Sequence, residues 1–213
     1  MKKPRILLAD DHKIVTEGLR SLLEQEFDLV GFAADGRELI AKTSELNPDL
    51  IVVDISMPLL NGIDAVRMLR EQGSAVKVVF LTMHSDATYL TRALDAGASG
   101  YVLKHAASDE LITAIQHALR GQIFLSPQLR TAPVEELLDE TRRRVKPSIE
   151  LTTRQREILQ LLAEGKSAKE IGAILNISPR TVETHKYKMM DDLGVTTSAQ
   201  LVQHAIRHGL VSV

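Results

Sequence analysis

The stretch LIVVD at residues 50–54 is the most informative part of the chain. Its four apolar residues lead directly into a carboxylate, and turn residues follow at 57–58 (MP) and 61–62 (NG). A short apolar run bounded by turn residues predicts a strand that is buried on both faces. Asp54 is therefore expected at the carboxyl end of a strand, which is where open α/β sheets bind their ligands.

Three further apolar runs also end in polar residues, and a weaker run lies at 29–33. The three runs are 5–9, followed by Asp10 and Asp11; 77–81, followed by Thr82; and 100–103, followed by Lys104. The carboxyl ends of parallel strands meet at the same edge of a sheet. We therefore expect three carboxylates, a hydroxyl and an ammonium to gather at one edge.

Helical patterns alternate with these strands. Apolar residues recur at helical spacing in the segments 14–23, 38–46, 65–69, 87–96 and 108–119. Ser108 is the expected N-cap of the last of these helices, and Gly121 its expected stop. Five strands alternating with five helices predict an α/β domain over residues 1–121, built on a doubly wound, five-stranded parallel sheet.

The overall composition narrows the class of protein. Of the 213 residues, 44% are hydrophobic and 25% are charged, as in ordinary globular proteins. The absence of cysteine excludes disulfides, thiolate metal sites and cysteine nucleophiles. The apolar run after the basic start is too short for a signal peptide, and no stretch is long enough to span a membrane. We expect a cytoplasmic protein with no membrane partner.

Residues 122–149 lose the alternating pattern and are expected to be a linker. Pro127, Pro133 and Pro147 interrupt this segment, and residues 134–144 have the spacing of one amphipathic helix. The basic run at 142–146 is expected to be a solvated face rather than a phosphate contact.

Residues 150–213 are expected to form an all-α domain of four helices. The expected helix starts are Thr152 with Gln155, Ser167 with Glu170 and Thr197 with Gln200, which have capping-box spacing, and Ser178-Pro179. Only residues 176–177 separate the second helix from the third. So tight a connection is typical of a helix-turn-helix.

The acidic edge has the chemistry of a phosphoryl-accepting site. Asp10, Asp11 and Asp54 would repel one another without a cation, and an oxygen-only ligand set favours Mg²⁺. A carboxylate such as Asp54 can attack phosphorus and form an aspartyl phosphate. Lys104 and Thr82 would hold the remaining oxygens of that phosphoryl group. Charge alone leaves open a Mg²⁺-dependent phosphohydrolase that turns over a small phosphate ester.

This set of residues resembles the receiver domain of two-component response regulators. The resemblance covers residues 5–120 and rests on Asp10-Asp11, Asp54, Thr82 and Lys104, each at its own strand end. It implies a flavodoxin-like fold in which Asp54 accepts a phosphoryl group from a sensor histidine kinase. It also implies that Thr82 and Lys104 register the phosphorylation.

The same resemblance implies roles for several neighbouring residues. The backbone carbonyl of Ser56 would join the three aspartates as a Mg²⁺ ligand, and Tyr101 would be a switch that rotates inward as the threonine moves. Ser56 and His84 would either set how fast water removes the phosphoryl group or be simple exposed loop residues. His105 replaces the proline that many receivers have after the lysine, a departure that one subfamily shares.

The third helix of the second domain has the free face of a DNA-recognition helix. Val182, Met189 and Leu193 form a stripe, with His185 between them, that would face the domain itself. The opposite face presents Arg180, Glu183, Thr184, Tyr187, Lys188 and Asp191. A helix in the major groove needs such polar side chains on its free face and cations near its rim, which here also include Lys186. Backbone N–H groups at the helix start, Ser178, would bind a phosphate.

Residues 151–209 resemble the LuxR/NarL-type helix-turn-helix. The match rests on LTxRxxExL at 151–159, AKEIG at 168–172 and SPRTVxxH at 178–185. It implies base contacts from Glu183, Thr184 and Tyr187, and phosphate contacts from Lys166, Lys169, Thr181 and Lys188. Asp191 and Asp192 stand where the family usually has a lysine, so we expect modest affinity from one copy and a need for dimerisation.

Together the two resemblances imply a phosphorylation-controlled transcription factor and not an enzyme. The expected partners are a sensor histidine kinase, promoter DNA, RNA polymerase and a second copy of the chain. Residues 150–213 carry 8 Lys and Arg against 7 Asp and Glu. This weak basicity keeps open a regulator that acts through protein contacts without DNA binding. The sequence GKS at 165–167 is no P-loop, because the upstream glycine is missing and the segment follows a helix.

Overall fold

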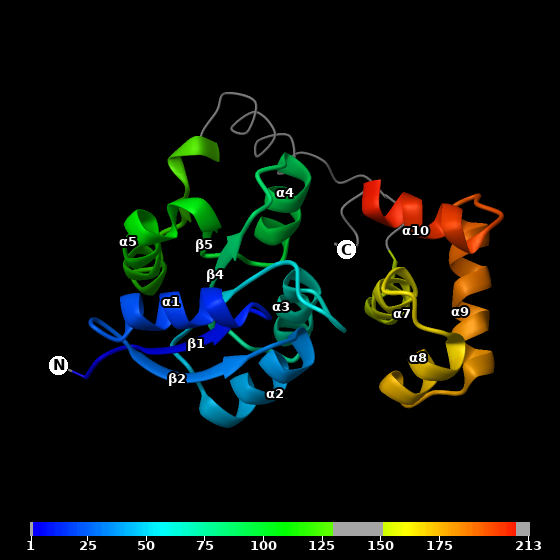
Figure 1. Ribbon diagram of the computed structural model, residues 1–213, viewed down its shortest axis with the longest axis horizontal. Helices are drawn as coiled ribbons and strands as arrows, with labels where there is room; N and C mark the ends of the chain where they lie inside the picture. Colours follow the sequence, from blue (N-terminus) through cyan, green and yellow to red (C-terminus); the bar gives the residue numbers. More distant parts are fainter. Residues whose placement is uncertain (1, 130–150, 208–213) are drawn as a thin grey trace. The chain divides into compact units, whose positions relative to one another are not determined.

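The computed structural model describes residues 2–129 and 151–207 (Figure 1). The chain divides into two compact units, residues 1–145 and 146–213. Most of the expected linker, including its expected helix over 134–144 and the basic run at 142–146, lies outside the described residues.

The first unit is built on a parallel sheet. Its strands are β1 (Arg5–Ala9), β2 (Asp28–Ala33), β3 (Leu50–Val53), β4 (Lys77–Thr82), β5 (Gly100–Leu103) and β6 (Phe124–Leu125). Their order in the sheet is β2-β1-β3-β4-β5-β6, and every neighbouring pair is parallel. The parallel α/β sheet expected from the sequence is confirmed.

The sheet has one strand more than the five that the sequence predicts. β6 pairs with the edge of β5 through Gly100 opposite Phe124 and Tyr101 opposite Leu125. A strand of two residues is too short to produce a readable alternation, so periodicity could not reveal it. The segment predicted as a linker therefore begins with residues that belong to the sheet.

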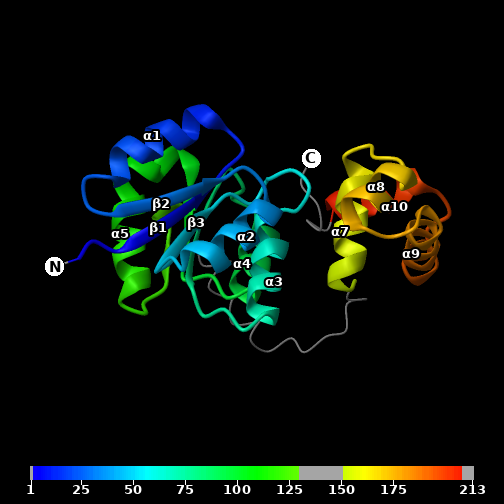
Figure 2. The same ribbon diagram turned by 90° about the horizontal axis from the view of Figure 1, so that it is seen from below.

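Helices cover both faces of this sheet (Figures 1 and 2). They are α1 (Lys13–Leu23), α2 (Gly36–Leu46), α3 (Gly62–Glu71), α4 (Ala87–Asp95) and α5 (Ala107–Leu119). Apolar residues of α1 and α5 share one core with one face of the sheet, and those of α2, α3 and α4 share the core on the other face. The four residues of β3 are fully buried between these layers, as their unbroken apolar run predicts.

The expected N-cap at Ser108 is wrong. The N-cap of α5 is Ala106, two residues earlier, and it makes no side-chain cap hydrogen bond. A short 3₁₀ helix, Lys104–Ala106, leads directly into α5, so the chain is already helical before Ser108 is reached.

Gly62 holds the loop after β3 close to the phosphoacceptor candidate. A Cβ atom on this residue would lie 2.0 Å from the backbone oxygen of Asp54, so no larger residue fits without movement. The Gly62 amide donates to the carbonyl of Ile55 at 2.9 Å, and Asn61 caps α3 by accepting from the Asp64 amide at 2.9 Å. These contacts fix the backbone of Asp54 at the end of its strand.

The second unit consists, within the described residues, of four short helices. They are α7 (Thr153–Ala163), α8 (Ala168–Leu175), α9 (Pro179–Asp192) and α10 (Ser198–Arg207). Thr152 and Ser167 form complete capping boxes, and Ser178 caps α9. Asn176 takes a left-handed conformation with φ 53°, which ends α8 and turns the chain into α9. Among the residues described, we find no helix with the length and apolar character that crossing a bilayer requires.

We predict that Gly62→Ala destabilises the first unit, because its new methyl group would collide with the backbone of Asp54. The expected loss is about 1–3 kcal/mol of unfolding free energy, measured by urea denaturation of the full chain. Gly18→Ala is the matched control: Gly18 lies in α1 with open space where a Cβ atom would stand, so the change should stabilise by up to about 1 kcal/mol. Equal midpoints for the two variants would contradict the prediction.

Candidate functional site

The polar residues that follow the parallel strands meet at one edge of the sheet. β1 and β3 are neighbours, and the Asp54 amide donates to the carbonyl of Ala9 at 2.8 Å, so Asp10 and Asp54 leave the sheet side by side. Lys104, directly after β5, places its Nζ 2.7 Å from Asp10 Oδ2 and 2.8 Å from Asp54 Oδ2. One ammonium thus joins two carboxylates from different strands.

This arrangement is buried, and burial and the contacts among its members act in opposite directions on their pKa values. Asp10 is 5% exposed and Asp54 4%. Burial raises the pKa of Asp54, although the Lys104 ammonium and the Ser56 amide act to lower it. Burial acts to lower the pKa of Lys104, but its two carboxylate partners outweigh burial and raise it. Lys104 therefore remains a fixed positive charge against both aspartates.

The carboxylates have the geometry of a cation site. The possible ligand atoms of Asp10, Asp11, His12 and Asp54 all lie within 4.8 Å of one another. Asp10 Oδ2 is buried and lies 2.7 Å from the Lys104 ammonium. A carboxylate oxygen in this position fits a hard divalent cation, and the oxygen-rich ligand set fits Mg²⁺.

His12 was missed by reasoning from the sequence, which expected an oxygen-only cluster. Its Nδ1 lies 2.8 Å from Asp11 Oδ1 and 3.3 Å from Asp10 Oδ1, and its amide donates to Asp10 Oδ1 at 2.9 Å. The only signal available was its place directly after the two aspartates. Its contacts orient both carboxylates.

Thr82 and Tyr101 meet at the loop after β4. Both side chains are fully buried. Thr82 Oγ1 accepts from the His84 amide at 3.2 Å, and the Tyr101 hydroxyl donates to the His84 carbonyl at 2.8 Å. Burial raises the pKa of Tyr101, so its hydroxyl stays protonated and remains a donor. The tyrosine ring is therefore held inside the receiver, with its hydroxyl against the backbone of the loop after β4.

Ser56 and His84 are not simple exposed loop residues. Ser56 Oγ and His84 Nε2 form a hydrogen bond of 2.8 Å between the loops that follow β3 and β4. The His84 ring stacks on Tyr89 with centroids 4.0 Å apart. Burial lowers the pKa of His84, which favours the neutral ring in this contact.

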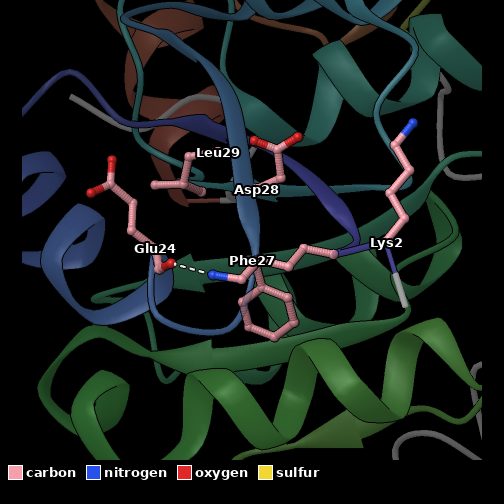
Figure 3. A pocket seen from close by; sticks show the side chains of 6 residues that line it. Lys2, Glu24, Phe27, Asp28 and Leu29 are labelled. Carbon is pink, nitrogen blue, oxygen red and sulfur yellow. Dashed lines mark hydrogen bonds between the residues drawn. The ribbon is translucent and has the colours of Figure 1, made fainter.

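A pocket at the opposite edge of the sheet contains none of the candidate residues. Its volume is about 470 Å³, and Figure 3 shows residues that line it. The lining residues are Lys2, Lys3, Glu24, Phe27, Asp28 and Leu29. They precede or begin β1 and β2, whereas Asp10 and Asp54 follow the carboxyl ends of their strands. Lys3 Nζ already donates to the carbonyl of Glu24 at 2.9 Å, so this pocket is a poor candidate for the functional site.

The residues expected to contact DNA lie on the free face and N-cap of α9, except Lys169 in α8 and Lys166 in the turn before α8. Val182 and Met189 are buried, which turns the opposite side of the helix to solvent. The exposed candidates are Lys169, Ser178, Arg180, Thr181, Thr184, Tyr187 and Lys188, and the partly buried ones are Lys166 and Glu183. Tyr187 is 61% exposed, so its ring is accessible on the free face of α9.

Two details of α9 modify its expected chemistry. Glu183 forms an ion pair with Lys186 on the same helix, so its carboxylate is partly neutralised. The Ser178 hydroxyl accepts from the Thr181 amide at 3.0 Å, and is therefore used as the helix cap. A phosphate at this helix start would meet backbone N–H groups rather than a free serine hydroxyl.

The turn before α9 is fixed by residues of the expected motif. Arg154 of α7 donates through Nη2 to the carbonyl of Leu175 at 2.7 Å and through Nη1 to Glu157 Oε2 at 3.0 Å. A Cβ atom on Gly172 would lie 2.7 Å from the carbonyl oxygen of Ile177, so α8 and the turn touch directly. These contacts set the angle at which α9 leaves the turn.

The chain matches two protein-family models, one for each unit. The model described as response regulator receiver domain matches residues 6–116. The model described as bacterial regulatory proteins, luxR family, matches residues 150–205.

The chain also resembles known proteins along its whole length. It is 35% identical to the transcriptional regulatory protein MctR of Rhizobium johnstonii, over 99% of this chain and 96% of that one. It is 34% identical to the oxygen regulatory protein NreC of Staphylococcus carnosus, over 97% of this chain and 99% of the relative.

Two solved structures extend this comparison. A LuxR-family two-component response regulator from Aurantimonas sp. SI85-9A1 is 36% identical with a TM-score of 0.59, covering 67% of this chain and 100% of that one. RcsB of Salmonella enterica serovar Typhimurium, bound to a promoter in the presence of the phosphomimetic BeF3⁻, is 28% identical with a TM-score of 0.61. That match covers 95% of this chain and 98% of the other.

We predict that Lys104→Ala destabilises the metal-free protein by about 3 kcal/mol, because two buried carboxylates lose their shared cation. Added Mg²⁺ should raise the melting temperature of this variant more than that of the wild type, since the metal then supplies the missing charge. Arg20→Ala, which breaks an exposed ion pair with Glu24, should cost less than about 1 kcal/mol and leave the Mg²⁺ effect unchanged. An equal Mg²⁺ effect in Lys104→Ala and wild type would refute the shared-charge explanation.

Proposed function

The chain belongs to the response regulators with a LuxR-type DNA-binding domain, and on this basis we propose that Asp54 accepts the phosphoryl group that controls promoter binding by α9. We propose the boundaries expected from the sequence, a receiver at 1–121, a linker at 122–149 and a DNA-binding domain at 150–213, except that β6 and the buried Leu129 extend the receiver into the linker. The observation that carries the proposal is the Lys104 ammonium held between Asp10 and Asp54.

The transfer step follows from the charges at this edge. A carboxylate oxygen of Asp54 forms a bond to the phosphorus of a phosphohistidine on the sensor kinase. The P–N bond breaks, and its electron pair stays on the imidazole nitrogen. Lys104, which contacts Asp54, and the buried Thr82 hydroxyl would bind the phosphoryl oxygens as negative charge accumulates.

A divalent cation would complete this site. Asp10, Asp11 and Asp54 would hold Mg²⁺ together with the carbonyl of Ser56, and the ion would neutralise charge on the transferring phosphoryl group. His12 would act beside them by orienting Asp10 and Asp11. Its hydrogen bonds are the reason we assign it a supporting role rather than a place among the ligands.

The signal reaches DNA through a shift between two conformations. Phosphorylation of Asp54 would move Thr82 towards the phosphoryl group and hold Tyr101 inward against His84. The shifted form would pair with a second copy of the chain. Two copies would then place their α9 helices on the half-sites of a two-fold symmetric promoter, with Thr184, Tyr187 and Glu183 reading bases.

The remaining partners follow from this output. A regulator bound at a promoter would contact RNA polymerase, and its DNA target places it in the cytoplasm. A protein turning over small phosphate esters is disfavoured, because the relatives are transcriptional and oxygen regulatory proteins. Retention of DNA distinguishes the proposed function from the alternative of a regulator that acts through protein contacts.

We predict that beryllium fluoride with Mg²⁺ increases the affinity of the full chain for a selected two-fold symmetric genomic site, and that Asp54→Asn abolishes the increase. Selection of genomic fragments followed by quantitative footprinting measures both. Equal affinity in every condition would mean that Asp54 is not the switch. Failure to retain any DNA would favour the alternative without DNA binding.

We predict that Lys188→Ala weakens binding to all sequences alike and lowers the slope of log affinity against log salt by about 1, as expected for one phosphate contact. Thr184→Ala should instead reduce discrimination between the selected site and a mutated site, by about 1–3 kcal/mol. Lys77→Ala, in the receiver, is the control and should change neither quantity. Identical behaviour of the Lys188 and Thr184 variants would contradict these assignments.

A further inference from the structure

Ser126 is a fully buried polar residue that belongs neither to the phosphoryl site nor to the DNA-binding surface. It follows β6 directly and makes contacts in three directions. Its amide donates to the carbonyl of Tyr101 at 2.9 Å, its Oγ accepts from the Leu103 amide at 3.1 Å, and the same hydroxyl donates to Glu110 Oε2 of α5.

The hydroxyl replaces a missing strand bond. β6 ends at Leu125 because the 3₁₀ turn Pro127–Leu129 takes the chain away from the sheet. The Leu103 amide lies beyond the last residue of β6. The Ser126 side chain therefore supplies its acceptor in place of a backbone carbonyl. A buried N–H group is costly to leave unpaired, so this contact constrains the backbone.

Ser126 is therefore hydrogen-bonded to β5 at Tyr101 and next to Lys104, the residues proposed above to act in the switch. One of its bonds goes to the carbonyl of Tyr101 itself, and another comes from the amide of Leu103, the residue directly before Lys104. Lys104 contacts Asp54, and the Tyr101 hydroxyl contacts His84. A displacement of β5 at either residue must change the geometry at Ser126.

The other side of Ser126 leads towards the DNA-binding domain. Its carbonyl accepts from the Leu129 amide at 2.9 Å, and Leu129 is buried in the receiver core with 3% exposure. Along the sequence, Leu129 is the last described residue before the segment that joins the two units. Ser126 is thus hydrogen-bonded both to the switch strand and to the start of the connection.

We propose that Ser126, held by Glu110, couples the phosphorylation switch in β5 to the segment that leads to the DNA-binding domain. It is a positioning residue: it touches neither the phosphoryl group nor DNA. The inference rests on the switch roles proposed above for Tyr101 and Lys104, and it adds the path by which their movement leaves the receiver.

The test compares the promoter affinity of the full chain with and without beryllium fluoride and Mg²⁺. The ratio of the two affinities is the coupling, commonly about 5- to 150-fold in allosteric proteins. Ser126→Ala should bind beryllium fluoride as the wild type does, yet its affinity ratio should fall to within about twofold of 1. Glu110→Ala should also lower the affinity ratio. Glu110→Gln keeps an acceptor for the Ser126 hydroxyl, so it should keep the wild-type ratio.

Two measurements separate coupling from a general loss of structure. Ser108→Ala, on the exposed surface of α5, is the matched control and should keep the wild-type ratio. Hydrogen exchange at residues 124–129 should change on adding beryllium fluoride in the wild type but not in Ser126→Ala. If Ser126→Ala fails to fold, the comparison of Glu110→Ala with Glu110→Gln decides.

A wild-type ratio in Ser126→Ala, or equal ratios in Glu110→Ala and Glu110→Gln, would overturn the inference. The function proposed above would survive that result, because the wild type would still respond to beryllium fluoride. If the wild type itself shows no response, then the proposed function fails first, and the role of Ser126 fails with it.

Discussion

The receiver depends on one electrostatic constraint: two buried carboxylates share a single ammonium. Asp10 and Asp54 end neighbouring strands, so the parallel sheet forces their charges together in a region with little water. Lys104 contacts both and keeps its charge because both partners favour it. A site held at this balance responds to any added charge, whether a metal ion or a phosphoryl group. The surrounding loops are arranged around that response.

Much of this site could be predicted from the sequence, for a simple reason. Buried parallel strands have unbroken apolar runs, and the residue after each run must lie at one edge, so Asp10, Asp54, Thr82 and Lys104 could be placed together from the pattern alone. β6 could not, since two residues carry no period. Nor could the start of α5, which a preceding 3₁₀ turn moved ahead of Ser108.

The contacts between loops could not be predicted from the sequence either. The hydrogen bond between Ser56 and His84 joins residues 28 positions apart, and no local pattern specifies such a pairing. His12 was overlooked because a single histidine has no period and its partners are decided by a turn. Helix caps in the DNA-binding domain were more accessible, since Thr152 and Ser167 act within one turn of their own helices and need no tertiary contact.

His84 takes part in the site through three separate chemical groups. Its amide donates to Thr82 Oγ1, and its carbonyl accepts from the Tyr101 hydroxyl. Its ring forms a hydrogen bond with Ser56 and stacks on Tyr89. Replacing the side chain leaves both backbone groups in place. A substitution at residue 84 can therefore change the side-chain contacts with Ser56 and Tyr89 while the backbone hydrogen bonds of Thr82 and Tyr101 remain. The side-chain contact between the two loops and the backbone hydrogen bonds to the buried residues are, in this receiver, features that can vary independently.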